Sequence, residues 1–120
     1  LAEDNDLNME IAEFMLQSAG AEVTEARDGR EAVELFRALP TGYFDAVLMD
    51  VMMPVLDGYQ ATGIIRASER PDAGVPVIAM TANAFVEDRQ RAREAGMTEH
   101  LPKPLDQAVL VQTLQRWKKE

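Results

Sequence analysis

Apolar positions along the chain follow two alternating patterns. In five segments they recur every three or four residues, which is typical of amphipathic helices. The helices expected from this spacing span residues 6–19, 30–39, 59–69, 84–95 and 105–118. Shorter apolar runs at 22–26, 44–50, 75–80 and 98–101 are typical of strands. Strands that alternate with helices predict an open parallel α/β sheet with helices on both faces.

Local signals refine the helix ends. Asn5 or Asp6 is expected to cap the first helix, and Ile11 belongs to the apolar positions of that helix. Asp28-Gly29 is expected to form a turn before the second helix. The first two helices therefore each have a start that the sequence predicts independently of the periodicity.

Composition and charge narrow the function. The chain has 120 residues, which suits one domain, and 47% of them are apolar, as in a folded core. A formal net charge of −9 argues against direct nucleic-acid binding, because phosphate backbones require a basic face. No apolar run approaches the ~18 residues of a membrane span, so no membrane contact is expected. Cysteine is absent and His100 is the only histidine, which excludes thiolate catalysis and multi-histidine metal sites and permits a cytoplasmic location.

Polar side chains stand where the expected strands end. Asp50, Thr81 and Lys103 follow three of them, and Glu3-Asp4 follows the short apolar start of the chain. In a parallel sheet these positions meet at one edge, where such folds bind ligands. Three carboxylates repel one another unless a cation is present, and their hard oxygen atoms select Mg²⁺. An Asp beside Mg²⁺ can attack phosphorus, while a Lys and a Thr hydroxyl neutralise the phosphoryl oxygens.

Four motifs occupy these positions. They are Glu3-Asp4-Asn5, Met49-Asp50-Val51-Met52-Met53-Pro54-Val55-Leu56-Asp57-Gly58, Met80-Thr81-Ala82-Asn83-Ala84 and Leu101-Pro102-Lys103-Pro104. With these motifs in this order, the chain resembles the receiver domains of two-component signalling over essentially its whole length. Receivers are the phosphoacceptor modules of response regulators and hybrid histidine kinases. The resemblance implies one receiver domain, residues 1–120, with a flavodoxin-like doubly wound parallel sheet of five strands in the order 2-1-3-4-5.

The resemblance also implies a role for each motif. Asp50 accepts the phosphoryl group from a phosphohistidine, and Thr81 and Lys103 bind the phosphoryl oxygens. The implied cofactor is Mg²⁺, with the ligands Glu3, Asp4, Asp50 and the backbone carbonyl of Met52. The domain itself catalyses only its own phosphorylation and dephosphorylation.

Three further positions follow from the resemblance. His100 stands at a switch position that often holds Tyr or Phe, so the usual aromatic movement is not expected here. The Lys103-Pro104 peptide bond is expected to be cis. Met52 and Asn83 flank the path of the hydrolytic water, and neither is a useful base, so slow to intermediate dephosphorylation is expected.

The expected partner is a histidine kinase dimerisation domain or a histidine-phosphotransfer domain. Leu7 and Phe14 lie off the main buried stripe of the first helix, and with Met53 and Pro104 they are expected to frame an apolar collar for that partner, unless they simply pack locally. The last two motifs favour a receiver from a hybrid kinase. The alternatives are a stand-alone response regulator, a pseudo-receiver that only binds proteins, and an aspartate-dependent phosphatase, although Asp50-Val51-Met52 lacks the second acid of that class.

The first strand of the implied fold is truncated in this chain. Only Leu1 and Ala2 precede Glu3, yet the implied strand order places this strand between the second and the third. So short a central strand leaves neighbouring backbone groups unpaired. The sequence therefore predicts several apolar residues before Leu1 in the native protein, or another chain or segment that fills the gap.

Overall fold

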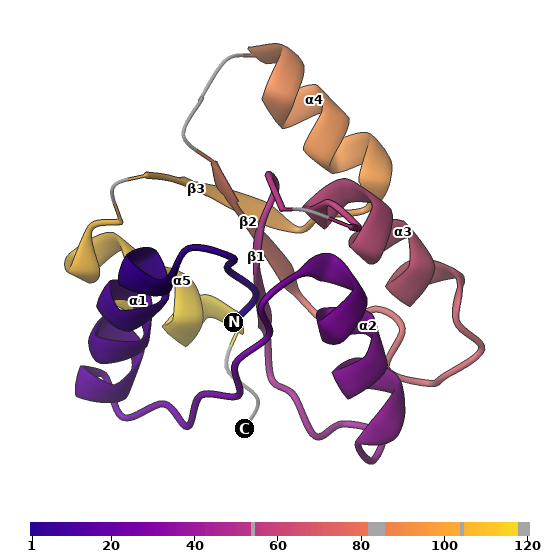
Figure 1. The fold of residues 1–120 in the computed structure, drawn as a ribbon, viewed down its shortest axis with the longest axis horizontal. Helices are drawn as coiled ribbons and strands as arrows, with labels where there is room; N and C mark the ends of the chain where they lie inside the picture. Colours follow the sequence, from indigo (N-terminus) through magenta and orange to yellow (C-terminus); the bar gives the residue numbers. More distant parts are fainter. Residues whose placement is uncertain (54, 82–85, 104, 118–120) are drawn as a thin grey trace.

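Five helices and three strands are found in the part of the chain that the computed structural model describes, residues 1–53, 55–81, 86–103 and 105–117. The helices are α1 (Asp6–Ser18), α2 (Gly29–Ala38), α3 (Gly58–Ala67), α4 (Val86–Ala95) and α5 (Gln107–Trp117). The strands are β1 (Val47–Asp50), β2 (Val77–Thr81) and β3 (Glu99–Pro102). From α2 onward helices and strands alternate as the sequence predicted, but among the described residues no strand separates α1 from α2 (Figure 1).

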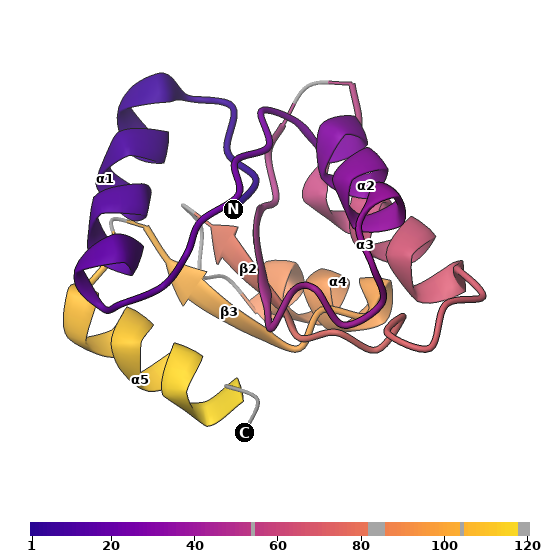
Figure 2. The same cartoon turned by 90° about the horizontal axis from the view of Figure 1, so that it is seen from below.

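The strands form one parallel sheet in the order β1-β2-β3. Side chains alternate between its two faces, and both faces are covered by helices. Leu48, Ile78 and Met80 pack with Leu16 of α1 and Leu110 of α5. Figures 1 and 2 show α1 and α5 on this side and the other three helices on the opposite side.

The second face carries the larger apolar cluster. Met49, Val77 and Ala79 point to α2, α3 and α4, where Phe36 and Ile65 are among the buried residues. Because both faces of the strands are buried by apolar side chains, the polar side chains of the sheet, including the buried Asp50 and Thr81, stand at the carboxyl ends of the strands. The helices thereby leave these ends as the place for polar side chains.

The five-stranded sheet is not found in the described part of the chain. Ala2 makes isolated parallel bridges to Ala26 on one side and to Met49 on the other. The start of the chain thus lies between the 22–26 segment and β1, as expected for a truncated first strand (Figure 2). The expectation of a strand at 22–26 is wrong, because this segment has a ladder partner only at Ala26.

A groove marks the gap between these segments. It has a volume of about 570 Å³ and is lined by side chains that include Leu16, Val23, Leu48 and Trp117. The expected strand at 44–50 shrinks to β1 for the same reason, since residues 44–46 border the groove instead of a neighbouring strand. The gap therefore weakens strand pairing of the 22–26 segment on one side and of residues 44–46 on the other.

Capping explains where three helices begin. The Asn5 side chain accepts a hydrogen bond from the backbone N–H of Asn8 at 2.9 Å and caps α1. Asp28 caps α2 in the same way, so the expected Asp28-Gly29 turn is wrong and Gly29 is the first residue of that helix. Asp57 and Gln60 form a reciprocal capping box at the start of α3.

Candidate functional site

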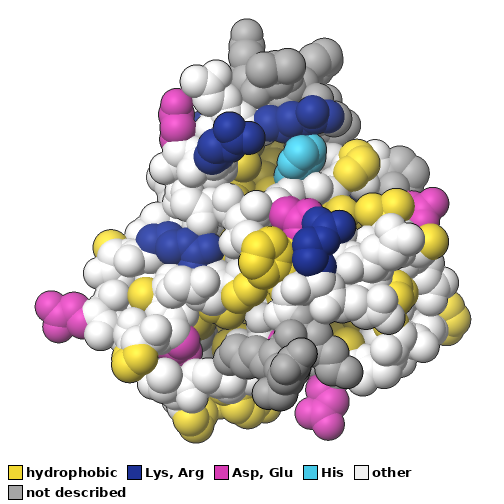
Figure 3. Space-filling model, turned by 180° about the vertical axis from the view of Figure 1, so that it is seen from behind, with side chains coloured by type: hydrophobic (Ala, Val, Ile, Leu, Met, Phe, Trp, Pro, Cys, Tyr) yellow, Lys and Arg dark blue, Asp and Glu magenta, His cyan; other side chains and the backbone are white. Residues whose placement is uncertain are grey.

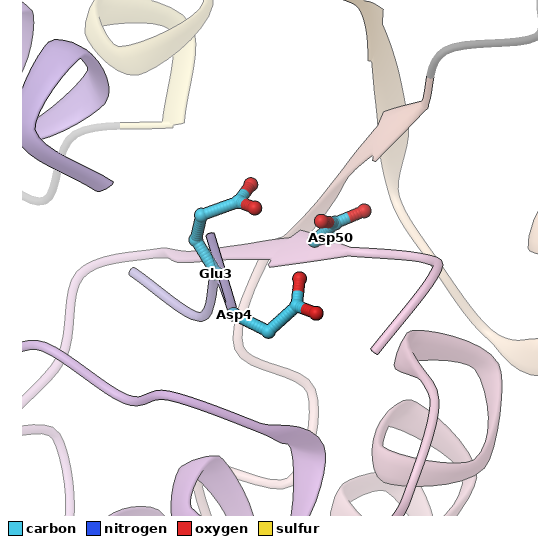
Figure 4. A group of neighbouring side chains, drawn as sticks. All are labelled: Glu3, Asp4 and Asp50. Atoms are coloured by element: carbon cyan, nitrogen blue, oxygen red, sulfur yellow. The ribbon is translucent and has the colours of Figure 1, made fainter. Parts of the chain in front are cut away.

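The chain start and the end of β1 bring carboxylates together. The Ala2 N–H donates to the Leu48 carbonyl at 2.8 Å, and the Asp50 N–H donates to the Ala2 carbonyl at 3.0 Å. This pairing places the residues that follow Ala2 beside the end of β1. Figure 4 shows the side chains of Glu3, Asp4 and Asp50 around one space at this edge of the sheet.

The three carboxylates form a compact cluster. One oxygen atom from each of Glu3, Asp4 and Asp50 lies within 4.8 Å of the others. Glu3 and Asp50 are buried, with 2% and 4% of their surface exposed, whereas Asp4 is exposed to solvent. Carboxylate oxygens that are partly open to water are the donor set that Mg²⁺ takes in proteins. The chemistry of the cluster therefore fits a hard divalent cation.

Lys103 joins this cluster from the end of β3. Its Nζ donates to Glu3 Oε2 at 2.8 Å and to Asp50 Oδ2 at 2.9 Å. The backbone N–H of Lys103 donates to the carbonyl of Thr81 at 2.8 Å, which continues the β2–β3 pairing and fixes the position of the lysine. The ammonium group therefore partly neutralises the two buried carboxylates.

Burial and ion pairing shift the pKa values of this pair in opposing ways. Burial raises the pKa of the Glu3 carboxyl above its ordinary value, although the hydrogen bond from Lys103 opposes that shift. Burial disfavours the charged form of Lys103, but its bonds to Glu3 and Asp50 dominate and raise the pKa of the ammonium. Lys103 is therefore held in its cationic form beside the acids.

The other expected site residues lie at different distances from the carboxylate cluster along the chain, and only some of them are among the described residues. Thr81 is buried at the last position of β2, at the same edge of the sheet. The backbone N–H of Met52 donates to Asp50 Oδ1 at 3.1 Å, and its side chain is 76% exposed. His100 is half-buried on β3, and the single histidine is visible in Figure 3 near basic side chains. Asn83 and Pro104 lie outside the described residues, as does the Lys103-Pro104 bond.

Two expectations for the apolar surroundings are wrong. Met53 is only 8% exposed and belongs to the apolar cluster on the face of the sheet that α2, α3 and α4 cover. It therefore does not contribute to an apolar collar. Ile11 is 46% exposed, so it does not belong to the buried stripe of α1. Leu7 and Phe14 are exposed as expected, at 64% and 69%.

Gly58 allows α3 to pack against the backbone of Asp50, a role that was not predicted from the sequence. A Cβ atom on this glycine would lie 2.4 Å from the backbone carbonyl oxygen of Asp50 and 2.9 Å from the Cα of Val51. Helix α3 can therefore begin directly beneath Asp50 only because residue 58 has no side chain. The available signal was the glycine that follows Asp57 at the end of the second motif.

The amino-acid sequence matches the model of a known protein family. Residues 1–115 match the model described as "Response regulator receiver domain". The chain belongs to the receiver family. It is therefore a receiver domain of two-component signalling, as the resemblance of its four motifs predicted.

The curated relatives are sensor kinases. The chain is 38% identical over 117 residues to sensor protein GacS of Pseudomonas syringae pv. syringae, covering 96% of the chain and 13% of that protein. It is 32% identical over 117 residues to hybrid signal transduction histidine kinase I of Dictyostelium discoideum, covering 95% of the chain and 7% of the kinase. The chain thus spans a small part of the length of these relatives.

Solved structures of receivers superimpose on the chain. The receiver domain of sensor histidine kinase PA1611 from Pseudomonas aeruginosa PAO1, which holds a magnesium ion in its active-site cleft, is 46% identical with a TM-score of 0.87. That match covers 97% of this chain and 92% of the other. The receiver domain of Saccharomyces cerevisiae Ssk1, solved with the histidine phosphotransfer protein Ypd1, is 27% identical with a TM-score of 0.84 and covers 98% and 85% of the two chains.

In the part of the chain that the structure describes, no helix combines the length and the apolar character needed to cross a bilayer.

Proposed function

We propose that this receiver accepts a phosphoryl group on Asp50 in a two-component phosphorelay. The observation that carries the proposal is the buried Asp50 carboxylate between two further acids and the Lys103 ammonium at the open edge of the sheet. A buried carboxylate with a fixed cation and a cation-binding donor set is suited to attack phosphorus.

The proposed step exchanges one bond for another. An Asp50 carboxylate oxygen forms a bond to the phosphorus atom of a phosphohistidine as the phosphorus–nitrogen bond breaks. The electron pair of that bond stays with the imidazole nitrogen, which becomes neutral or takes a proton from water. The product is an acyl phosphate on Asp50. The Lys103 ammonium contacts an oxygen of the phosphoryl group and offsets its negative charge.

Mg²⁺ is the proposed cofactor. Its ligands are Glu3, Asp4, Asp50 and the backbone carbonyl of Met52. Bound Mg²⁺ supplies positive charge that screens the acids from the incoming phosphoryl group. The carboxylate cluster supports this assignment, as does the magnesium ion that the Pseudomonas aeruginosa receiver holds.

The remaining site residues act around the phosphoryl group. We assign a second contact with its oxygens to the Thr81 hydroxyl, because Thr81 ends β2 beside the cluster. Met52 and Asn83 flank the path of the hydrolytic water and lack a basic group, so the acyl phosphate is expected to be long-lived enough for relay. His100 stands at the position of the usual aromatic switch, and as a half-buried residue of β3 it is expected to pack at the edge of the sheet rather than to move on phosphorylation.

The proposed donor is a phosphohistidine of a kinase dimerisation domain or a histidine-phosphotransfer domain. The relatives among hybrid kinases support an origin within such a kinase. The formal charge of −9 supports a protein partner over nucleic acid.

Binding of beryllium fluoride, an analogue of the phosphoryl group, tests the proposal. Fluorine NMR of the chain should show a bound signal only when Mg²⁺ is present, and Asp50→Ala should remove that signal. A bound signal that survives this substitution, or that forms without Mg²⁺, would contradict the assignment of the site.

A further inference from the structure

Met52 is the one methionine of the chain that the fold leaves largely in solvent. All seven methionines are among the described residues. Met52 is 76% exposed, whereas Met15 is half-buried on α1. The other five have at most 8% of their surface exposed; they are Met9, Met49, Met53, Met80 and Met97. A reagent in solution therefore reaches one thioether sulfur far more readily than the other six.

This exposed thioether stands beside the proposed phosphoacceptor. Met52 follows Asp50 by two residues, and its backbone N–H donates to Asp50 Oδ1 at 3.1 Å. Val51, which lies between them, is only 4% exposed. The chain thus passes from the core to the solvent within two residues of Asp50. The side chain of Met52 begins at the rim of the acidic site and ends in solvent.

A methionine in this place is open to oxidation by a hydroperoxide. With hydrogen peroxide, the sulfur gives an electron pair to one peroxide oxygen, so that a sulfur–oxygen bond forms as the oxygen–oxygen bond breaks. The departing hydroxide takes the proton from the sulfur-bound oxygen and leaves as water. The sulfur is oxidised to a sulfoxide, and the peroxide is reduced. Hydrogen peroxide carries no charge, so the acids of the site and the net charge of −9 do not repel it.

Oxidation changes how this side chain acts on water. A thioether is apolar and a weak hydrogen-bond acceptor, whereas a sulfoxide is polar and accepts hydrogen bonds through its oxygen. Met52 flanks the proposed path of the hydrolytic water to the acyl phosphate on Asp50. An acceptor at that point orients the water and so favours its attack on phosphorus. The proposed metal ligand is the backbone carbonyl of Met52, which the oxidation does not alter.

We propose that Met52 is a reversible oxidation site that sets the lifetime of the phosphoryl group on Asp50. The thioether shields the acyl phosphate from water, and the sulfoxide shortens its lifetime. This inference rests on the proposed function. The oxidant is a hydroperoxide, and a methionine sulfoxide reductase reverses the change by returning the oxygen as water. Under oxidising conditions the receiver therefore holds its phosphoryl group for a shorter time.

The test first locates the oxidation and then measures its effect. The chain is treated with hydrogen peroxide, freed of it and mapped by peptide mass spectrometry. Met52 should gain one oxygen atom about fivefold faster than any other methionine, because buried sulfur atoms are reached only through local opening. The oxidised chain, labelled with radioactive acetyl phosphate and Mg²⁺, should lose its label with a half-life about threefold shorter than that of the untreated chain. Repair by a methionine sulfoxide reductase should restore the half-life.

Two variants of Met52 and a matched control assign the effect to its sulfur. Met52→Leu keeps an apolar side chain without sulfur, so peroxide should leave the half-life of this variant as it was before treatment. Met52→Gln carries an oxygen on the atom that replaces the sulfur, and it should show the short half-life without peroxide. Met15→Leu is the control at the next most exposed methionine, and it should respond to peroxide as the unaltered chain does.

The outcomes separate this inference from the proposed function. A half-life that oxidation of Met52 leaves unchanged or lengthens overturns the inference, as does an equal loss in peroxide-treated Met52→Leu. Faster oxidation of another methionine also overturns it. If the untreated chain takes no phosphoryl group from acetyl phosphate with Mg²⁺ present, the proposed function is wrong and this inference falls with it. A labelled chain whose half-life does not respond to peroxide overturns this inference alone.

Discussion

Replacement of Lys103 by Met tests how the site balances its charges. The substitution keeps most of the side-chain volume and removes the ammonium group that lies 2.8 Å from Glu3 and 2.9 Å from Asp50. Removing one partner of a buried ion pair costs about 3–5 kcal/mol. Uptake of a proton by Glu3, whose pKa burial already raises, limits the loss. We therefore expect the free energy of unfolding to fall by about 2 kcal/mol near neutral pH without metal.

Magnesium should reverse this loss. In the unaltered chain an incoming cation competes with the Lys103 ammonium for Glu3 and Asp50, and in Lys103→Met it does not. The variant should bind Mg²⁺ about tenfold more tightly, which corresponds to about 1.4 kcal/mol. Saturating Mg²⁺ should therefore stabilise the variant more than the unaltered chain.

Acid should also narrow the difference in stability between Lys103→Met and the unaltered chain. A carboxyl whose pKa is raised in the folded state contributes stability that is present at low pH and lost as pH rises through the folded pKa. Without Lys103 the pKa of Glu3 rises further, so the deficit of the variant should shrink as the pH falls toward the ordinary pKa of a glutamate.

Thermal unfolding in EDTA and in saturating Mg²⁺, with titration calorimetry for the affinity, measures these effects. Arg30→Met is the matched control, because Arg30 pairs with Glu34 at the surface and its loss should cost less than about 0.5 kcal/mol. A Mg²⁺ affinity that Lys103→Met leaves unchanged or weakens, or a deficit that neither Mg²⁺ nor acid reduces, would refute the reasoning.

Two other predictions address the rest of the site. Gly58→Ala should lower the free energy of unfolding, measured in urea, by more than about 2 kcal/mol, because its Cβ would meet the Asp50 carbonyl. Gly63→Ala is the control: a Cβ there would have nothing within 4 Å, so this substitution should stabilise the chain slightly. Equal effects of the two substitutions would contradict the close approach of Gly58 to Asp50. Met52→Asn should shorten the half-life of the phosphoryl group on Asp50 severalfold, because the Asn side chain can orient a water. An unchanged or longer half-life, with folding intact, would count against the idea that Met52 shields the phosphoryl group from water.

The helices were the most predictable part of the fold. Their apolar spacing and their caps are local, so the expected bounds of α1, α2 and α3 agree with the structure within two residues at each end. Periodicity alone did not settle which apolar face of α1 is buried. Ile11 and Ala12 are neighbours in sequence and both apolar, yet Ile11 is exposed and Ala12 is buried, because the position of the sheet decides between them.

Strands and site contacts depend on partners far away in the sequence. The segment 22–26 has the composition of a strand, but pairing requires neighbours, and Ala2 is its one bridge partner among the described residues. Motif positions predicted that Glu3, Asp4 and Asp50 would converge, because parallel strands end at one edge. The ion pair between Lys103 and Glu3 joins residues a hundred positions apart. The motif positions predicted that both residues lie at one edge of the sheet, but not that their side chains bond to each other.

Mass spectrometry of the phosphorylated chain tests the central claim most directly. After incubation with acetyl phosphate and Mg²⁺, the chain should gain the mass of one phosphoryl group, and borohydride reduction followed by peptide mapping should place it on Asp50. Asp50→Ala and removal of Mg²⁺ with EDTA should each abolish the gain. A phosphoryl group found on another residue, or no gain under conditions in which the chain is folded and Mg²⁺ is bound, would contradict the account.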